Sequence, residues 1–204
     1  MTNDRIVAFR TLRALGVHSR WFRESLLLPL TISAVALAGM YAGYLLFHVL
    51  AELTSILVGI MALVVATTSR RFSRNNFFVF IGIGLGWCAF IDLLHMLTYK
   101  GMDIVPGADA NTATQLWIAA RGLQAFALLA APAFLVSTPR AAWVHAGFGI
   151  ATALLVGSIA SGYFPVCYIE GQGLTAFKIV SEYVIIAALA AGAVRLHAQR
   201  ALLS

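Results

Sequence analysis

The chain has 204 residues, of which 61% are hydrophobic and 11% are charged. Soluble domains usually carry about a quarter of charged residues, so this composition argues against a soluble globular protein. The net charge of +6 comes from basic residues that lie beside apolar runs and form no separate patch, which argues against a nucleic-acid-binding surface and favours a role in membrane topology.

The hydropathy pattern predicts an all-α membrane bundle of about six transmembrane helices. Residues 1–24 contain five arginines and no continuous apolar core, which indicates either an amphipathic helix on the membrane surface or a disordered basic leader. The apolar run 25–68 is about twice as long as one span, so it must form two helices, with a turn near residues 43–47. The later spans are predicted at residues 76–99, 112–136, 139–161 and 174–194.

Helix-end signals support these spans. Thr112 followed by Gln115 fits a capping box at the start of the fourth predicted span. Gly101 is well placed to end the third span.

The distribution of basic residues predicts the orientation in the membrane. One set of connections is basic, and the opposite set is more acidic, which places both termini in the cytoplasm. The basic set comprises the leader, Arg70, Arg71, Arg74, Arg140, Arg195 and Arg200, and the opposite set comprises Lys100, Asp103, Asp109 and Glu170.

Polar side chains from four predicted spans share one depth in the half of the bundle away from the cytoplasm. Counting 1.5 Å per residue, Asp92, Arg121 and Glu182 lie roughly 12 Å from the outer ends of their helices. Ionisable groups at this depth cost free energy and need a structural or functional reason. The predicted layer comprises His48, Glu52, Asp92, His95, Trp117, Arg121, Lys178 and Glu182.

Helical spacing places these residues on common faces. Because lipid would not solvate them, each stripe is expected to face the bundle interior. The stripes are His48, Glu52 and Ser55; Asp92, His95 and Tyr99; Trp117, Arg121 and Gln124; and Lys178 with Glu182.

This layer predicts a metal or ligand pocket that opens away from the cytoplasm. Two imidazoles and two carboxylates suit Zn, Fe, Mn or Cu(II), and the predicted metal ligands are His48, Glu52, Asp92 and His95. The predicted ligand-binding residues around them are Tyr99, Trp117, Arg121, Gln124, Lys178 and Glu182.

Other interpretations of the same layer remain open. His48 and His95 could be the axial ligands of a haem, and a quinone would need only imidazole, phenol or indole donors. A metal-free polar ligand is a further alternative. The residues could also be purely structural, with Arg121 paired to a carboxylate and Lys178 paired to Glu182.

Three ordered motifs carry a family resemblance. They are Phe47-His48-x-x-x-Glu52-x-x-Ser55-Ile56, then Asp92-Leu93-Leu94-His95-x-Leu97-x-Tyr99-Lys100-Gly101-Met102, then Gln115-Leu116-Trp117-Ile118-Ala119-Ala120-Arg121. Together they resemble the third family of the bacterial membrane-associated sensor domains, the MASE series. The resemblance is close from about Phe47 to Pro132 and extends over the rest of the chain only in hydropathy.

The resemblance implies a sensory input domain in the bacterial inner membrane, placed before a histidine kinase or a cyclic-di-GMP enzyme. Residues 25–196 would form the multi-pass sensor domain, and residues 197–204 would begin a linker to an output domain, which carries the catalytic activity. The expected partners are membrane lipid, a small ligand or metal, a second copy in a homodimer, and no nucleic acid. The alternatives are a membrane-embedded zinc hydrolase acting on lipid-like substrates and, last, a transporter.

Overall fold

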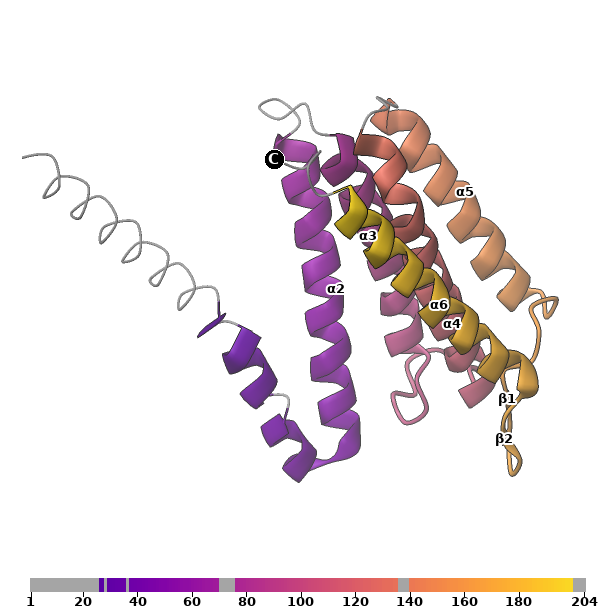
Figure 1. The fold of residues 1–204 in the computed structure, drawn as a ribbon. Helices are drawn as coiled ribbons and strands as arrows, with labels where there is room; N and C mark the ends of the chain where they lie inside the picture. Colours follow the sequence, from indigo (N-terminus) through magenta and orange to yellow (C-terminus); the bar gives the residue numbers. More distant parts are fainter. Residues whose placement is uncertain (1–25, 28, 36, 70–75, 136–139, 200–204) are drawn as a thin grey trace, which may run out of the picture. The chain divides into compact units, whose positions relative to one another are not determined.

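The computed structural model describes residues 26–27, 29–35, 37–69, 76–135 and 140–199 (Figure 1). The predicted leader and the end of the predicted linker lie outside these residues. The chain divides into two compact units, an N-terminal unit, Met1–Ala51, and a C-terminal unit, Glu52–Ser204. The boundary between them falls inside one continuous helix.

The N-terminal unit contains a short apolar helix, Pro29–Ala42, and the first turns of α2, Tyr44–Ser69. Gly43 separates the two helices with a φ of 140°, a backbone conformation that favours glycine. The prediction that the first apolar run forms two helices is therefore confirmed, and the break lies at the first residue of the predicted turn. Gly39 allows the short helix to approach α2 closely, because a Cβ there would lie 3.2 Å from the side chain of Leu50.

The C-terminal unit holds the rest of α2 and four further helices. These are α3 (Asn76–Leu97), α4 (Ala110–Ala130), which continues as the short 3-10 helix η1 (Ala131–Leu135), α5 (Ala141–Ala160) and α6 (Ala176–Ala198) (Figure 1). Between α5 and α6, β1 (Tyr168–Ile169) pairs with β2 (Gly173–Leu174) as an antiparallel hairpin.

The predicted all-α membrane bundle is confirmed. In the described part of the chain, five helices are long and apolar enough to cross a membrane: α2, α3, α4 with η1, α5 and α6. The sixth apolar helix, Pro29–Ala42, is shorter than a usual span. The orientation of the termini stays a prediction, because Arg70, Arg71, Arg74 and Arg200 lie outside the described residues.

Helices α3 and α4 form the centre of the C-terminal unit. They pack against each other, α5 packs on both, and α6 packs mainly on α4. Residues 52–69 of α2 pack on α3 at Gly59, where a Cβ would lie 2.8 Å from the Cβ of Ala89. On the other side, a Cβ at Gly192 of α6 would lie 3.1 Å from the carbonyl oxygen of Leu128 in α4. Glycine at these contacts lets the helix backbones approach closely, as is common in membrane bundles.

The predicted capping box at the start of α4 is wrong. The helix begins at Ala110, and Asp109 is its N-cap, with a carboxylate oxygen that accepts a hydrogen bond of 2.6 Å from the backbone N–H of Thr112. A carboxylate is favoured over a hydroxyl here because its negative charge also interacts with the helix dipole. Gln115 donates instead to carbonyl groups of the segment before β1.

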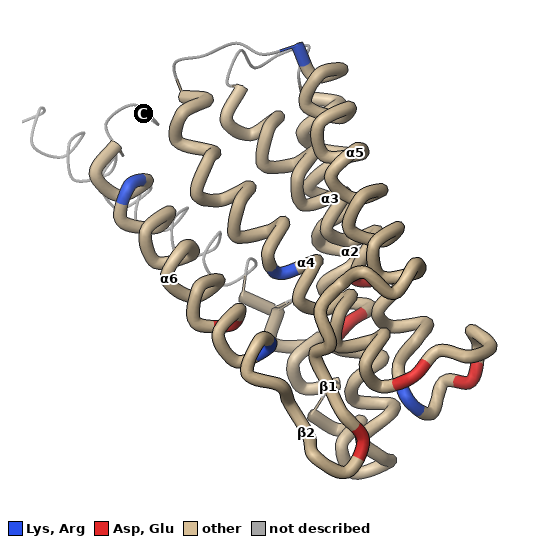
Figure 2. The backbone as a smooth tube through the Cα atoms, turned by 90° about the vertical axis from the view of Figure 1, so that its right-hand side faces the viewer, with Lys and Arg blue, Asp and Glu red and all other residues tan. Residues whose placement is uncertain are grey.

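Charges are distributed unevenly along the bundle. The acidic residues of the C-terminal unit lie toward the end that carries β1 and β2 (Figure 2). This is the end where the predicted polar layer was expected, and the candidate site lies in that part of the helices.

Candidate functional site

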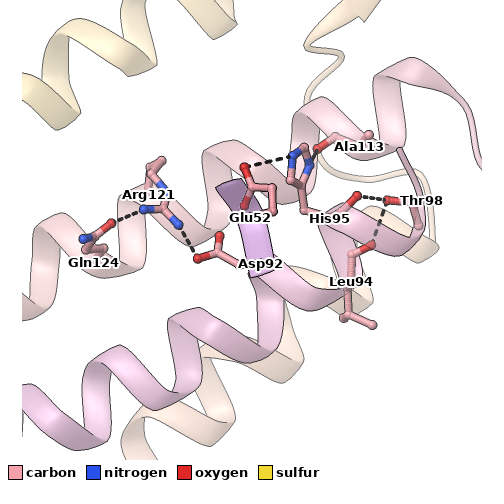
Figure 3. A network of polar contacts seen from close by, with 8 residues as sticks. All are labelled: Glu52, Asp92, Leu94, His95, Thr98, Ala113, Arg121 and Gln124. Atoms are coloured by element: carbon pink, nitrogen blue, oxygen red, sulfur yellow. Dashed lines mark hydrogen bonds and ion pairs between the residues drawn. The ribbon is translucent and has the colours of Figure 1, made fainter. Parts of the chain in front are cut away.

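The His95 ring has defined partners for both nitrogens. His95 lies near the end of α3 and is 4% exposed. Its Nδ1 lies 2.7 Å from the carbonyl oxygen of Ala113 in α4 (Figure 3). Because a carbonyl oxygen can only accept, Nδ1 must carry a proton and donate this hydrogen bond. In the neutral ring, Nε2 is therefore the nitrogen that carries no proton.

The second ring nitrogen of His95, Nε2, faces a carboxylate. Nε2 lies 3.9 Å from Oε1 of Glu52 in α2, which is longer than a hydrogen bond (Figure 3). Glu52 reaches this position because α2 and α3 approach closely. The small side chain of Ala113 likewise leaves the α4 backbone accessible to the imidazole. The ring of Tyr99, in the turn after α3, meets the His95 ring edge-on with 6.0 Å between the ring centroids.

A second group of polar side chains joins α3 to α4. Arg121 of α4 donates hydrogen bonds to Asp92 of α3 and to Gln124 one turn further along α4 (Figure 3). The Asp92 side chain is 4% exposed and the Arg121 side chain 22%. Within the described part of the chain, Oδ1 of Asp92 and Nε of Arg121 have no hydrogen-bond partner. Buried polar atoms of this kind are usually satisfied, so a small polar group or ion would find binding capacity here.

The two groups adjoin each other, so their charges act on one another. The charges of Asp92 and Arg121 both act on Glu52. When both carboxylates are ionised, one guanidinium leaves one negative charge uncompensated if His95 is neutral. An uncompensated charge inside a membrane bundle is costly, so this arrangement favours a cationic guest over an anionic one.

The remaining residues of the predicted layer form a separate contact between α4 and α6. Lys178 lies 2.7 Å from Oε1 of Glu182 on the same helix, and its ammonium group lies 5.0 Å from the centre of the Trp117 ring in α4. The Lys178 side chain is 12% exposed. Such a partly desolvated cation–π contact stabilises the docking of α6 on α4.

His48 belongs to the N-terminal unit, where its ring stacks on Tyr44 at 6.2 Å. In the continuous helix α2 it stands one turn before Glu52. In the C-terminal unit, the structure brings together Glu52, Asp92, His95, Tyr99, Arg121 and Gln124 as one network, and Trp117, Lys178 and Glu182 as another contact.

Two residues at the start of α4 hold the neighbouring loop in place and were not predicted. Oδ1 of Asn111 accepts backbone hydrogen bonds from Cys167 at 2.8 Å and Tyr168 at 3.0 Å, and Gln115 donates to two carbonyls of the same segment at 3.0 Å each. Cys167 is fully buried, and burial raises the pKa of its thiol to about 11. The signal that could have identified the pair is their spacing of four residues on one face of α4.

A polar cavity of about 230 Å³ lies at this end of the bundle, next to the His95 network. Tyr99, which contacts the His95 ring, is part of its lining. The other polar lining residues are Thr98, Lys100, Asp103, Asp109 and Glu170.

Two of these lining residues have shifted pKa values. Lys100 and Glu170 form an exposed ion pair of 2.8 Å, and this hydrogen bond and charge raise the pKa of Lys100. The N–H of Thr112 lowers the pKa of the Asp109 carboxyl. The cavity therefore has charged walls.

Comparison with curated proteins and with solved structures gives no match. A family model, MASE3, described as a membrane-associated sensor domain, matches residues 40–204. The match includes the whole of α2 to α6 and both polar groups, and it agrees with the resemblance carried by the three sequence motifs. The chain belongs to the MASE3 family of membrane-associated sensor domains.

Proposed function

We propose that this segment is the sensory input domain of a bacterial signalling receptor, a multi-pass protein of the inner membrane. It binds a divalent transition-metal ion at Glu52 and His95 and passes the signal through α6. The output is a histidine kinase or a cyclic-di-GMP enzyme. The observation that carries the proposal is the His95 ring, with one nitrogen bound to a backbone carbonyl and the other facing a carboxylate.

This arrangement is typical of a metal-binding histidine. Such residues almost always donate the second ring N–H to a carbonyl or carboxylate, which fixes the tautomer and directs the other nitrogen to the ion. Two ligands of a tetrahedral zinc ion lie about 3.4 Å apart. The separation of 3.9 Å between Nε2 of His95 and Oε1 of Glu52 requires only a small adjustment. With both carboxylates ionised, the negative charge of the network also favours a cation.

One further residue is a candidate to complete the coordination. Asp92, the other carboxylate predicted as a ligand, pairs with Arg121 and is not among the possible ligands grouped with Glu52 and His95. His48 stands one turn before Glu52 in α2, so helical periodicity favours it as a third ligand. A nitrogen and oxygen donor set of this kind suits Zn²⁺, Mn²⁺, Fe²⁺ or Cu²⁺.

A metal ion is supported better than the alternatives. A haem would need the space beside Nε2 of His95 for its macrocycle, and the Glu52 carboxylate lies there. Membership of a sensor-domain family favours sensing over hydrolysis of lipid-like substrates.

Helix α4 is the route from the site to α6. It carries Arg121 of the network and, one turn earlier, Trp117, which contacts Lys178 of α6. Further along the contact between α4 and α6, Gly192 of α6 lies close to the α4 backbone. Arg195 of α6 donates a hydrogen bond of 3.0 Å to a backbone carbonyl of α4. An ion that moves α4 relative to α3 would therefore displace α6, provided that it binds one arrangement of the helices more tightly.

Metal binding to the detergent-purified protein tests the proposal. After treatment with a chelator, the protein is titrated with Zn²⁺ and with Co²⁺, whose absorption reports tetrahedral coordination, and bound metal is measured by elemental analysis. We expect about one equivalent, as one site requires. His95→Gln and Glu52→Gln should abolish binding, whereas His145→Gln, in α5 and outside the network, should bind like the wild type.

Two outcomes of this experiment would contradict the proposed metal site. A wild-type protein that takes up neither ion at micromolar free concentration would refute the metal site, and so would a His95→Gln variant that still binds one equivalent. In either case, membership of the sensor family would stand and the ligand would be of another class.

A further inference from the structure

An apolar hollow of about 560 Å³ lies between α5 and the end of α4 with η1. Its volume falls in the range of small-molecule pockets, about 300–1,000 Å³. The lining is strongly aromatic and includes Phe80, Phe126, Phe134, Trp143, Gly147 and Phe148. Among its described lining residues, only Trp143 carries a polar side-chain atom. None of these residues belongs to the His95 network.

The hollow is kept open by its own side chains. The rings of Phe80 and Phe134 stack at 3.9 Å, and the Phe80 and Phe148 centroids lie 5.4 Å apart. These contacts hold the aromatic walls in place. Gly147 leaves space on the α5 side, because a Cβ there would meet no atom within 4 Å. The mouth is open at Phe126 and Trp143, which are 58% and 70% exposed.

The chemistry of the lining favours a hydrocarbon chain as the occupant. Helix α5 has the length and composition of a membrane span, so the hollow faces the hydrocarbon of the bilayer. A quinone would bury two carbonyl groups against a wall that offers only one donor, and burying unpaired polar groups is costly. A flexible acyl chain loses no hydrogen bond by entering.

The end of the hollow nearest the start of α5 favours an anionic head group. Arg140 is the N-cap residue of α5, is exposed, and makes no side-chain capping hydrogen bond. It lies about one turn before Trp143 and Val144, which both line the hollow. Tryptophan is typical of the head-group level of a membrane, and arginine near that level attracts anionic lipids.

We infer that this hollow binds one acyl chain of an anionic phospholipid, with the phosphate of the head group at Arg140. The bound chain would fill the space between α5 and α4 with η1, and would stabilise the position of α5. This lipid site is independent of the proposed metal site.

Native mass spectrometry of the delipidated protein tests the inference. The protein is titrated with phosphatidylglycerol and with phosphatidylethanolamine of the same acyl chains. We expect one phosphatidylglycerol to bind about fivefold more tightly than phosphatidylethanolamine, which is the effect of one arginine on an anionic lipid. Gly147→Leu fills the hollow and should weaken phosphatidylglycerol binding about tenfold, as expected when two methylene groups are excluded.

Gly157→Leu is the matched control. It lies on the same helix, a Cβ there also meets no atom within 4 Å, and it is not part of the lining. It should bind phosphatidylglycerol like the wild type. Arg140→Gln should bind both lipids equally, and it tests the inference even if Gly147→Leu fails to fold, because Arg140 is exposed.

Three results would overturn the inference. They are equal binding of the two lipids by the wild type, equal losses in Gly147→Leu and Gly157→Leu, and a preference for phosphatidylglycerol that survives in Arg140→Gln. A purified protein that retains a quinone in this hollow would also overturn it, in favour of a different ligand class.

Discussion

Replacing Arg121 with methionine tests how strongly the buried charge pair stabilises the bundle. Arg121 pairs with Asp92, whose side chain is 4% exposed. Without the guanidinium, the carboxylate would remain buried with no opposite charge beside it. Removing one partner of a buried ion pair costs about 3–5 kcal/mol. Methionine keeps most of the side-chain volume, so little of this loss would come from a cavity.

The two partners should respond unequally, because they differ in exposure. Arg121 is 22% exposed, so in Asp92→Asn its charge retains some contact with polar surroundings. That variant should lose only about 1–3 kcal/mol, the cost of a weakened buried hydrogen bond. The double variant Asp92→Asn/Arg121→Met leaves neither charge buried. It should recover about 2 kcal/mol of the loss seen in Arg121→Met, because residues in contact are energetically coupled.

The free energy of unfolding can be measured in mixed micelles by titration with SDS, with far-UV circular dichroism as the signal. Lys100→Met is the matched control, because it breaks the ion pair with Glu170, whose two side chains are 68% and 80% exposed. Exposed pairs contribute little, so this variant should unfold like the wild type. The reasoning would be refuted if Arg121→Met were no less stable than Lys100→Met, or if the double variant were no more stable than Arg121→Met.

Three further predictions concern helix packing, the loop before β1 and acid stability. Gly59→Ala places a Cβ 2.8 Å from a backbone oxygen of α3 and should destabilise the protein by about 1–3 kcal/mol, measured by SDS unfolding. Gly157→Ala, in open space, should instead stabilise it by about 0.5–1 kcal/mol. Asn111→Ala removes the acceptor of two N–H groups in the loop that holds Cys167, so this thiol should become more accessible. Maleimide labelling of Cys167 at pH 8, measured by peptide mapping, should therefore increase. Equal labelling in the variant and the wild type would contradict the role of Asn111. In the wild type this labelling should accelerate as the pH approaches the thiol pKa of about 11. The pKa of Asp109 is lowered on folding, so its stabilisation is present above its ordinary pKa near 4 and is lost as the pH falls through the lowered value. The thermal midpoint of the wild type should therefore fall more below pH 4 than that of Asp109→Asn.

The helices were predictable from sequence because the bilayer sets their length. Their bounds agree with the predicted spans to within four residues at each end. The pairing of Asp92 with Arg121 was also among the open alternatives, because a buried arginine in a bundle needs a carboxylate. Lys178 and Glu182 pair as their spacing of four residues on one helix indicates.

The arrangement of the polar layer was only partly predictable. Counting residues along each helix gives the depth of a side chain in the membrane, but it does not give the direction in which that helix faces. Depth placed Glu182 and Asp92 at one level, yet in the structure Glu182 contacts Lys178 on α6 while Asp92 contacts Arg121 between α3 and α4. The rotation of each helix depends on its packing, which small residues such as Gly59 and Gly192 determine.

The contact that defines the tautomer of His95 could not be read from side-chain patterns at all. Its acceptor is a main-chain carbonyl at Ala113, and every residue offers such a group. What selects this carbonyl is the close approach of α3 and α4, which Ala113 permits because its side chain is small. The same helix carries Trp117 four residues after Ala113 and Arg121 four residues after Trp117. Arg121 contacts α3, whereas Trp117 contacts α6. Since α6 packs mainly on α4 and η1, the proposed signal from His95 would reach α6 chiefly through a movement of α4. The proposed coupling between the site and α6 therefore requires α4 to behave as a rigid element, and substitutions in α4 should separate metal binding from signalling.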